Sequence, residues 1–196
     1  MAGEPLEIAS PRVERVVGVR HNIQQQPAGF ALQPAFVRGV RAVSEAGRPF
    51  DLCITADQLP EALALVELCP DTSFVLDHCG KPAIRDDAFD EWARHLERLA
   101  LHDRVSCKIS GLLTEAREEQ RSASGMARWV GRAREYFGAS RLLYGSDWPV
   151  STLGGGAGRW RGIVDEITAG WPEADRRALF ADNAARVYGV SVPVHG

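Results

Sequence analysis

Two polar residues stand at the ends of short apolar runs of the kind that form buried strands. Asp147 follows the run Leu142–Tyr144, and His78 follows Phe74–Leu76 after a single aspartate. A carboxylate there can accept a proton from water or bind a metal, and a histidine can donate to an oxyanion or bind a metal. Each also has a structural interpretation, Asp147 as a helix or turn cap and His78 as an ordinary strand-end residue.

Two further strand-like runs carry candidate binding residues. Lys108 lies inside the apolar run Val105–Ile109. A lysine in a buried strand is costly unless it is paired or lines a cavity, and Lys108 shares its strand face with Ser110. The alternative is a lysine that ends the strand and extends to water. His21 follows the run Val16–Val19, and the same reasoning makes it a candidate.

Nucleophilic catalysis finds little support in the sequence. Ser110, His78 and Asp147 could be assembled as a Ser-His-Asp triad, yet no G-x-S-x-G motif accompanies the serine. Cys79 adjoins His78 and could be a thiol nucleophile, but neighbours along a strand point to opposite faces. The same alternation predicts that Asp77 and His78 point to opposite sides.

The elements that would position these residues alternate between strands and helices. One more strand-like run, Phe50–Ile54, lies second along the chain and brings the number of runs to five. Most of the runs are continuously apolar, as in strands buried on both faces. Gly154–Gly158 is interpreted as a mobile loop beside the site or a plain linker. Helical periodicity is predicted for Phe36–Ala46, Leu59–Cys69, Phe89–Leu101, Met126–Phe137, Ile163–Ala169 and Asp175–Tyr188. Strand followed by helix, repeated, predicts a parallel sheet.

The sheet could be open or part of a barrel. The runs recur about every 31 residues, so eight units would need about 250 residues, the usual size of a (β/α)₈ barrel. An open sheet of five strands would also fit the length. Polar residues at several strand ends favour the barrel, whose active sites are built there. A dinucleotide-binding sheet would instead carry a glycine-rich first turn, and no G-x-G-x-x-G or P-loop motif occurs.

Composition narrows the class of partner. The net charge of −3 gives no basic surplus, so we expect no nucleic-acid binding. No apolar run approaches about 18 residues and the start lacks a secretory signal, so we expect no membrane. The four cysteines form no C-x-x-C pair, which favours a reducing cytoplasm. A small-molecule substrate is the expected partner, and a homo-oligomer is left open.

Several motifs together resemble a known family. They are Gly18–His21, Leu76–Pro82, Cys107–Gly111, Tyr144–Pro149 and Asn183–Gly189. In this order, from about residue 10 to residue 190, they resemble the amidohydrolase-related family of metal-dependent hydrolases. Within that family they look like the sugar-lactonase branch of fuconolactonase-like and rhamnonolactonase-like proteins, which is akin to the dicarboxylate pyrone lactonases.

The resemblance implies a (β/α)₈ barrel of which strands 4–8, five of eight units, fall in residues 1–190, with 191–196 as a tail. The family opens with a His-x-His pair, and no two of the five histidines here are two apart. Met1–Arg15 looks like the end of the helix before the fourth strand. We therefore expect a chain truncated at its amino end.

The resemblance also implies the site. Asp147 and His78 would be catalytic, and His21, Lys108 and Trp148 would bind substrate. The expected reaction is the opening of a small lactone by water that Asp147 activates. A divalent, zinc-like metal on His78 and Asp147 is left open, because the ester is reactive enough for the metal to be dispensable. The alternatives are a metal-dependent decarboxylase or hydratase of the same superfamily and an inactive truncated fragment.

Overall fold

The fold is built on five parallel strands. The computed structural model describes residues 16–191, so the predictions for Met1–Arg15 and for 192–196 of the tail lie outside the described residues. Neighbouring strands pair in register, with Val19 opposite Phe50. The strands are β1 (Val19–Asn22), β2 (Phe50–Cys53), β3 (Phe74–Leu76), β4 (Val105–Ile109) and β5 (Leu142–Tyr144). The predicted α/β class is confirmed.

The order of the strands distinguishes a barrel from an open doubly wound sheet. The strands lie side by side in the sequence order β1-β2-β3-β4-β5, without reversal. Because βαβ crossovers are right-handed, an order that never reverses keeps the crossover helices on one face of the sheet. A doubly wound sheet reverses its order and covers both faces. The described chain is therefore a run of five consecutive units of a (β/α)₈-type barrel, as predicted.

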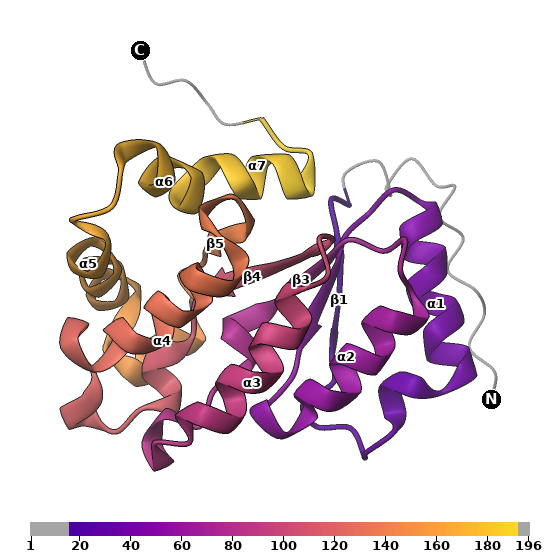
Figure 1. Cartoon of the computed structure of the whole chain (residues 1–196), viewed down its shortest axis with the longest axis horizontal. Coiled ribbons are helices and arrows are strands. Elements are labelled where there is room, and N and C mark those ends of the chain that lie inside the picture. Colours follow the sequence, from indigo (N-terminus) through magenta and orange to yellow (C-terminus); the bar gives the residue numbers. More distant parts are fainter. Residues whose placement is uncertain (1–15, 192–196) are drawn as a thin grey trace.

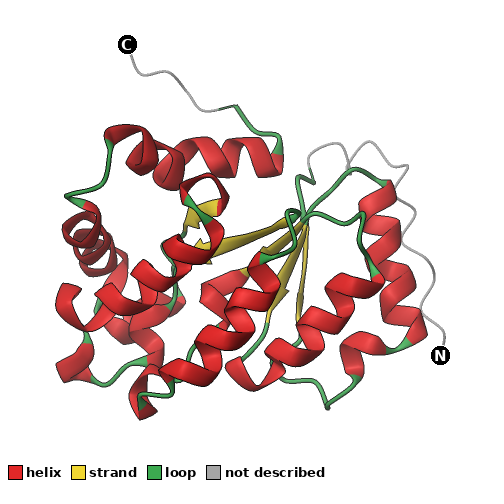
Figure 2. Cartoon of the chain, in the orientation of Figure 1, coloured by secondary structure: helices red, strands yellow, loops and turns green. Residues whose placement is uncertain are grey.

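Seven α-helices are assigned within residues 16–191 (Figure 1, Figure 2). They are α1 (Pro34–Glu45), α2 (Leu59–Leu68), α3 (Phe89–Ala100), α4 (Ala123–Phe137), α5 (Gly156–Thr168), α6 (Glu173–Arg177) and α7 (Asn183–Tyr188). The predicted helix 175–188 is a continuous helical path in which 178–182 form a π-helical turn between α6 and α7. None of the described helices combines the length and apolar character needed to span a bilayer.

Two local predictions are wrong. The first strand begins at Val19 rather than Val16, and Val16 is exposed rather than buried in a sheet. Gly154–Gly158 is not a loop, because Val150–Gly154 form a 3₁₀ turn and α5 begins at Gly156. Gly156 has a φ of 91°, which glycine adopts at little cost, so a glycine-rich segment can begin a helix here.

The two faces of the sheet differ in chemistry. On the helix-covered face, Phe36 of α1, Phe50 of β2 and Phe74 of β3 form a ladder of edge-on ring contacts. The opposite, inner face carries Asp51 of β2 and Lys108 of β4, one residue out of phase with the aromatic positions. Because side chains alternate along a strand, the apolar residues pack under the helices while the charged residues face the barrel interior.

The closing helix α7 lies beside β5 (Figure 1), and its side chains bond to the β5 segment and to β2. At its start the side-chain amide of Asn183 donates hydrogen bonds of 2.8 Å to the carbonyls of Ala139 and Leu142. At its end the hydroxyl of Tyr188 donates to Asp51 Oδ2 at 2.7 Å. The helix therefore links the last strand to the inner face of β2.

Candidate active site

Polar side chains converge on a cavity of about 380 Å³ at the carboxyl ends of the strands. Its lining includes Arg20 from β1, Cys53 from β2 and Lys108 from β4. His78 and Asp147 line it from the segments that follow β3 and β5. All five strands contribute to one cavity, as expected of a barrel active site.

A second cavity, also about 380 Å³, adjoins the first and shares Lys81 with it. Asp57 and His95 are among its lining residues, but it lacks both strand-end residues His78 and Asp147. We therefore locate the candidate chemistry in the first cavity.

The structure brings the two predicted catalytic residues together. His78 Nε2 lies 3.7 Å from Asp147 Oδ1. After β3 the chain turns sharply, and His78 and Cys79 take left-handed φ values of 56° and 52°. This turn breaks the strand alternation, so Asp77 and His78 both line the cavity and the predicted opposite orientation is wrong. Left-handed backbone is uncommon outside glycine and often marks a functional site.

An ionic cluster lies at the inner face of the sheet and consists of Arg20, Asp51, Asp77, Lys108 and Tyr188. Lys108 Nζ contacts Asp51 Oδ2 at 2.7 Å and Asp77 Oδ1 at 2.5 Å. Arg20 lies 3.5 Å from the other oxygen of Asp77, whose side chain is fully buried. Two cations therefore balance two carboxylates, and the charge of Lys108 is largely matched before any substrate enters.

The remaining predicted site residues divide between cavity and core. Trp148 lines the cavity and remains 73% exposed, so its ring can cover a ligand at the cavity mouth. His21 is not among the lining residues, and its ring stacks on Phe30 at 5.3 Å between centroids. The alternation along β1 points Arg20 inward and His21 towards the helices, so the predicted substrate-binding role does not fit His21.

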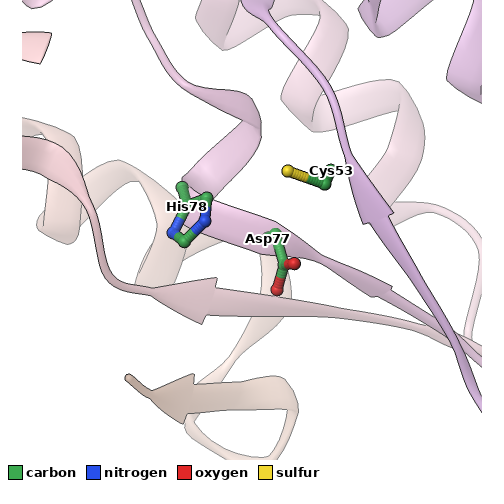
Figure 3. Close-up of side chains that lie close together, drawn as sticks. All are labelled: Cys53, Asp77 and His78. Atoms are coloured by element: carbon green, nitrogen blue, oxygen red, sulfur yellow. The ribbon is translucent and has the colours of Figure 1, made fainter. Parts of the chain in front are cut away.

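The sequence interpretation missed Arg20 and Cys53 as cavity residues. Cys53 lies at the end of the strand β2, and its sulfur points towards His78 (Figure 3). One ligand atom from each of Cys53, Asp77 and His78 lies within 4.8 Å of the others. A signal was present in the sequence. Cys53 lies two residues after Asp51 and therefore shares its strand face, and Arg20 lies next to His21 and therefore points to the opposite face of β1.

The geometry argues against both nucleophile alternatives, Cys79 and Ser110. Cys79 is fully buried, and its thiol donates to the carbonyl of Lys108 rather than facing the cavity. Ser110 is 1% exposed, and its hydroxyl bonds to His78 Nδ1 at 2.8 Å. Ser110 lines the cavity, but its hydroxyl is bonded to the nitrogen of His78 that lies away from Asp147 and the residue is almost fully buried, so the three residues do not form a triad with a serine free to attack. Asp147 and His78 remain the groups best placed to act on a ligand.

A family model described as amidohydrolase matches residues 7–190. The chain belongs to the amidohydrolase family. The resemblance found in the sequence is thereby confirmed.

Similar proteins include lactonases. The chain is 32% identical to an L-fucono-1,5-lactonase of Burkholderia ambifaria over 195 residues, which is 96% of this chain and 67% of that protein. It is 24% identical to an L-rhamnono-gamma-lactonase of Scheffersomyces stipitis, covering 89% of this chain and 59% of that one. An amidohydrolase structure from Burkholderia multivorans with bound zinc is 31% identical, with a TM-score of 0.84, over 93% of this chain and 70% of that one.

Two groups of side chains in this amidohydrolase are close enough together to be considered as ligands of a divalent metal. Two ligand atoms on one tetrahedral zinc stand about 3.3 Å apart, close to the 3.7 Å between His78 Nε2 and Asp147 Oδ1. The Cys53–Asp77–His78 group fits less well, because Asp77 already holds two cations. Burial also raises the pKa of the Cys53 thiol, which disfavours the thiolate that a metal needs. His78 and Asp147 are therefore the pair that fits a metal best.

The imidazole of His78 is neutral near pH 7. Burial lowers the pKa of His78 to about 4, against the opposing effect of the Asp147 carboxylate. Nearby Lys81, Lys108 and Arg20 act in the same direction as burial. A neutral ring carries one N–H and one lone pair, so it can donate one hydrogen bond to a ligand or coordinate a metal, according to its tautomer.

The stability of this amidohydrolase is expected to fall as the pH drops from 6.5, the ordinary pKa of histidine, towards the lowered pKa of about 4 for His78. Over this window the unfolded chain binds the proton more readily than the folded chain, so the contribution is complete above 6.5 and lost on acidification. The variant His78→Gln lacks the titrating imidazole and serves as the comparison. The difference in unfolding free energy between wild type and His78→Gln should therefore change by about 3 kcal/mol, to the disadvantage of the wild type, between pH 7 and pH 4. Urea unfolding at each pH measures it, and parallel pH curves would contradict the assignment.

Proposed function

We propose that this amidohydrolase opens a small sugar lactone by adding water to the lactone carbonyl. The observation that carries the proposal is the facing pair of His78 Nε2 and Asp147 Oδ1, 3.7 Å apart, in a cavity of about 380 Å³ at the strand ends. The lactonases among its relatives support a lactone as the substrate class. The chain spans about two thirds of the length of the fuconolactonases that it matches, so the activity proposed is that of the whole enzyme.

The proposed reaction uses one proton acceptor and one hydrogen-bond donor. Asp147 accepts a proton from water as the water oxygen attacks the carbonyl carbon. The neutral imidazole of His78 donates from Nε2 to the oxyanion that forms. The carbon–oxygen bond of the ring then breaks, and the ring oxygen takes the proton back from Asp147. Lactone and water thus give one hydroxy acid.

Residues around this pair fit a hydroxylated substrate. The side chain of Arg20 is 59% exposed and contacts Asp77 at 3.5 Å, which leaves guanidinium N–H groups for the substrate hydroxyls or the product carboxylate. Trp148 offers an apolar ring at the mouth, against which a sugar ring can pack. Lys108 lines the same cavity, but its charge is matched by Asp51 and Asp77, so Arg20 is the cation with N–H groups left for a ligand.

A divalent ion, when held by His78 and Asp147, would supply Lewis-acid polarisation of the carbonyl. A metal-dependent decarboxylase or hydratase on the same fold would depend on such an ion, and an inactive piece of a barrel would show no activity.

The four free cysteines, all buried, support the cytoplasmic location that we infer from their pattern.

Proton release from a panel of sugar 1,4- and 1,5-lactones, measured with and without a chelator, tests the proposal. We expect turnover above the enzyme-free rate that persists in part after chelation. Complete loss on chelation with restoration by zinc would contradict the metal-independent route and favour a Lewis-acid mechanism. Absence of turnover on every lactone would contradict the substrate class.

A further inference from the structure

We propose that Ser110 is the positioning residue that holds His78 in the tautomer with its proton on Nε2, facing Asp147. This proposal rests on the proposed function only for the use of that proton, which would be donated to the oxyanion.

The hydrogen bond between Ser110 and His78 is the first observation. Ser110 Oγ lies 2.8 Å from His78 Nδ1, and no other partner of Nδ1 is found among residues 16–191. Both side chains are buried, with Ser110 1% and His78 7% exposed, so water does not compete easily for this bond. A hydroxyl can donate or accept, so the contact fixes the ring but does not by itself choose the tautomer.

The choice is made on the other side of the ring. Asp147 Oδ1 stands 3.7 Å from Nε2, and a carboxylate is only an acceptor. A negative oxygen attracts an N–H and repels a lone pair, more strongly in a buried site than in water. The ring proton therefore belongs on Nε2, and the hydroxyl of Ser110 donates to the lone pair of Nδ1.

Two glycines leave room for this arrangement. A Cβ on Gly111, which follows Ser110 at a φ of 67°, would lie 2.7 Å from His78 Nδ1. A Cβ on Gly145 of the neighbouring segment would lie 3.0 Å from the Cβ of Ser110. The ring edge and the serine are therefore packed against bare backbone, and turning the ring over would exchange Nδ1 for a carbon and lose the hydrogen bond.

The assignment has a consequence for metal binding. A ring with its proton on Nε2 has no lone pair there for an ion. Coordination at Nε2 would need the proton on Nδ1, with Ser110 reversed to accept it. Ser110 and Asp147, on opposite sides of the ring, thus together decide between a hydrogen-bond donor and a metal ligand at the same nitrogen.

The test is the tautomer itself, read by long-range proton–nitrogen spectra of chain labelled with ¹⁵N-histidine at pH 7.5 without added metal. The signals of His78 are assigned by their loss in His78→Gln. We expect a pyrrole-type Nε2 and a pyridine-type Nδ1 in the wild type, and loss of this pattern to a mixture in Ser110→Ala. Ser110→Thr, which keeps the hydroxyl, should restore the pattern. Ser106→Ala is the matched control, because Ser106 is a buried serine on the same face of β4 and should leave the signals unchanged.

A wild-type spectrum with the proton on Nδ1, or the same tautomer in Ser110→Ala as in the wild type, would overturn the proposal. If lactone turnover is found, Ser110→Ala should lower kcat by about 10- to 100-fold with little change in KM, and Ser110→Thr should recover it. The spectra need no substrate, so failure of the lactonase assignment leaves this result readable. Should Ser110→Ala fail to fold, as judged by its melt, the wild-type and Ser110→Thr spectra still decide the tautomer.

Discussion

Asp147→Asn is expected to lower kcat for lactone hydrolysis by about 10²- to 10⁴-fold, the contribution typical of a general base. The amide keeps the size of the side chain but cannot accept a proton from water. Asparagine also tolerates the left-handed φ of 55° at this position, so the loop geometry should be preserved. Initial rates of proton release on the best lactone of the panel measure the effect.

Two controls separate chemistry from folding in this experiment. Asp182→Asn removes a carboxylate that is paired with Arg177 on the surface, and it should leave kcat unchanged. The melting temperatures of both variants should stay near that of the wild type. Wild-type turnover in Asp147→Asn would remove Asp147 from the mechanism.

The second large effect is expected from Lys108→Met, which should lower the free energy of unfolding by about 3–5 kcal/mol. The substitution keeps an unbranched side chain but leaves Asp51 and Asp77 facing each other without their shared cation. Burial already raises the pKa of Asp51, so its ionised form depends on that lysine. Urea unfolding at pH 7 measures the change.

If Lys108→Met is destabilising because it leaves unpaired carboxylates, removing those carboxylates as well should restore stability. The triple variant Asp51→Asn, Asp77→Asn and Lys108→Met removes all three charges together and should recover a large part of the loss. Arg117→Met is the surface comparison, because its 3.8 Å contact with Asp86 is exposed and should be worth less than about 1 kcal/mol. A loss below 1 kcal/mol in Lys108→Met would contradict the role of the ionic cluster.

The sequence predicted the strands and the two central residues because the underlying signals are local. Strands buried on both faces appear as short apolar runs, and β3, β4 and β5 match the predicted limits. Asp147 and His78 stand out because a polar residue at the end of such a run is unusual. Parallel strands then bring their carboxyl ends to one edge, so convergence follows without knowledge of loop structure.

What the sequence did not reveal depends on which side of each strand faces inward. His21 and Arg20 are adjacent, and only the pairing of β1 with β2 shows that Arg20 shares the inner face with Asp51. The orientation of His78 depends on a left-handed turn whose location Gly80 and Pro82 signal, though not its hand. Cys53 was missed as a cavity residue for the same reason, because it lies on the inner face of β2 with Asp51.

The hydrogen bond between Tyr188 and Asp51 joins residues 137 positions apart, which bears on how the chain is made. At about 5–20 residues per second, a ribosome would add Tyr188 roughly 7 to 27 seconds after Asp51. Lys108 is added 57 residues after Asp51, and from then until Tyr188 is added the carboxylate of Asp51 has its cation but lacks the phenol that completes its bonding. Contacts of such long range also form late in folding, because a large loop must close first. The inner wall beside the catalytic cavity is therefore completed late, although β2, which carries Asp51, is made well before α7.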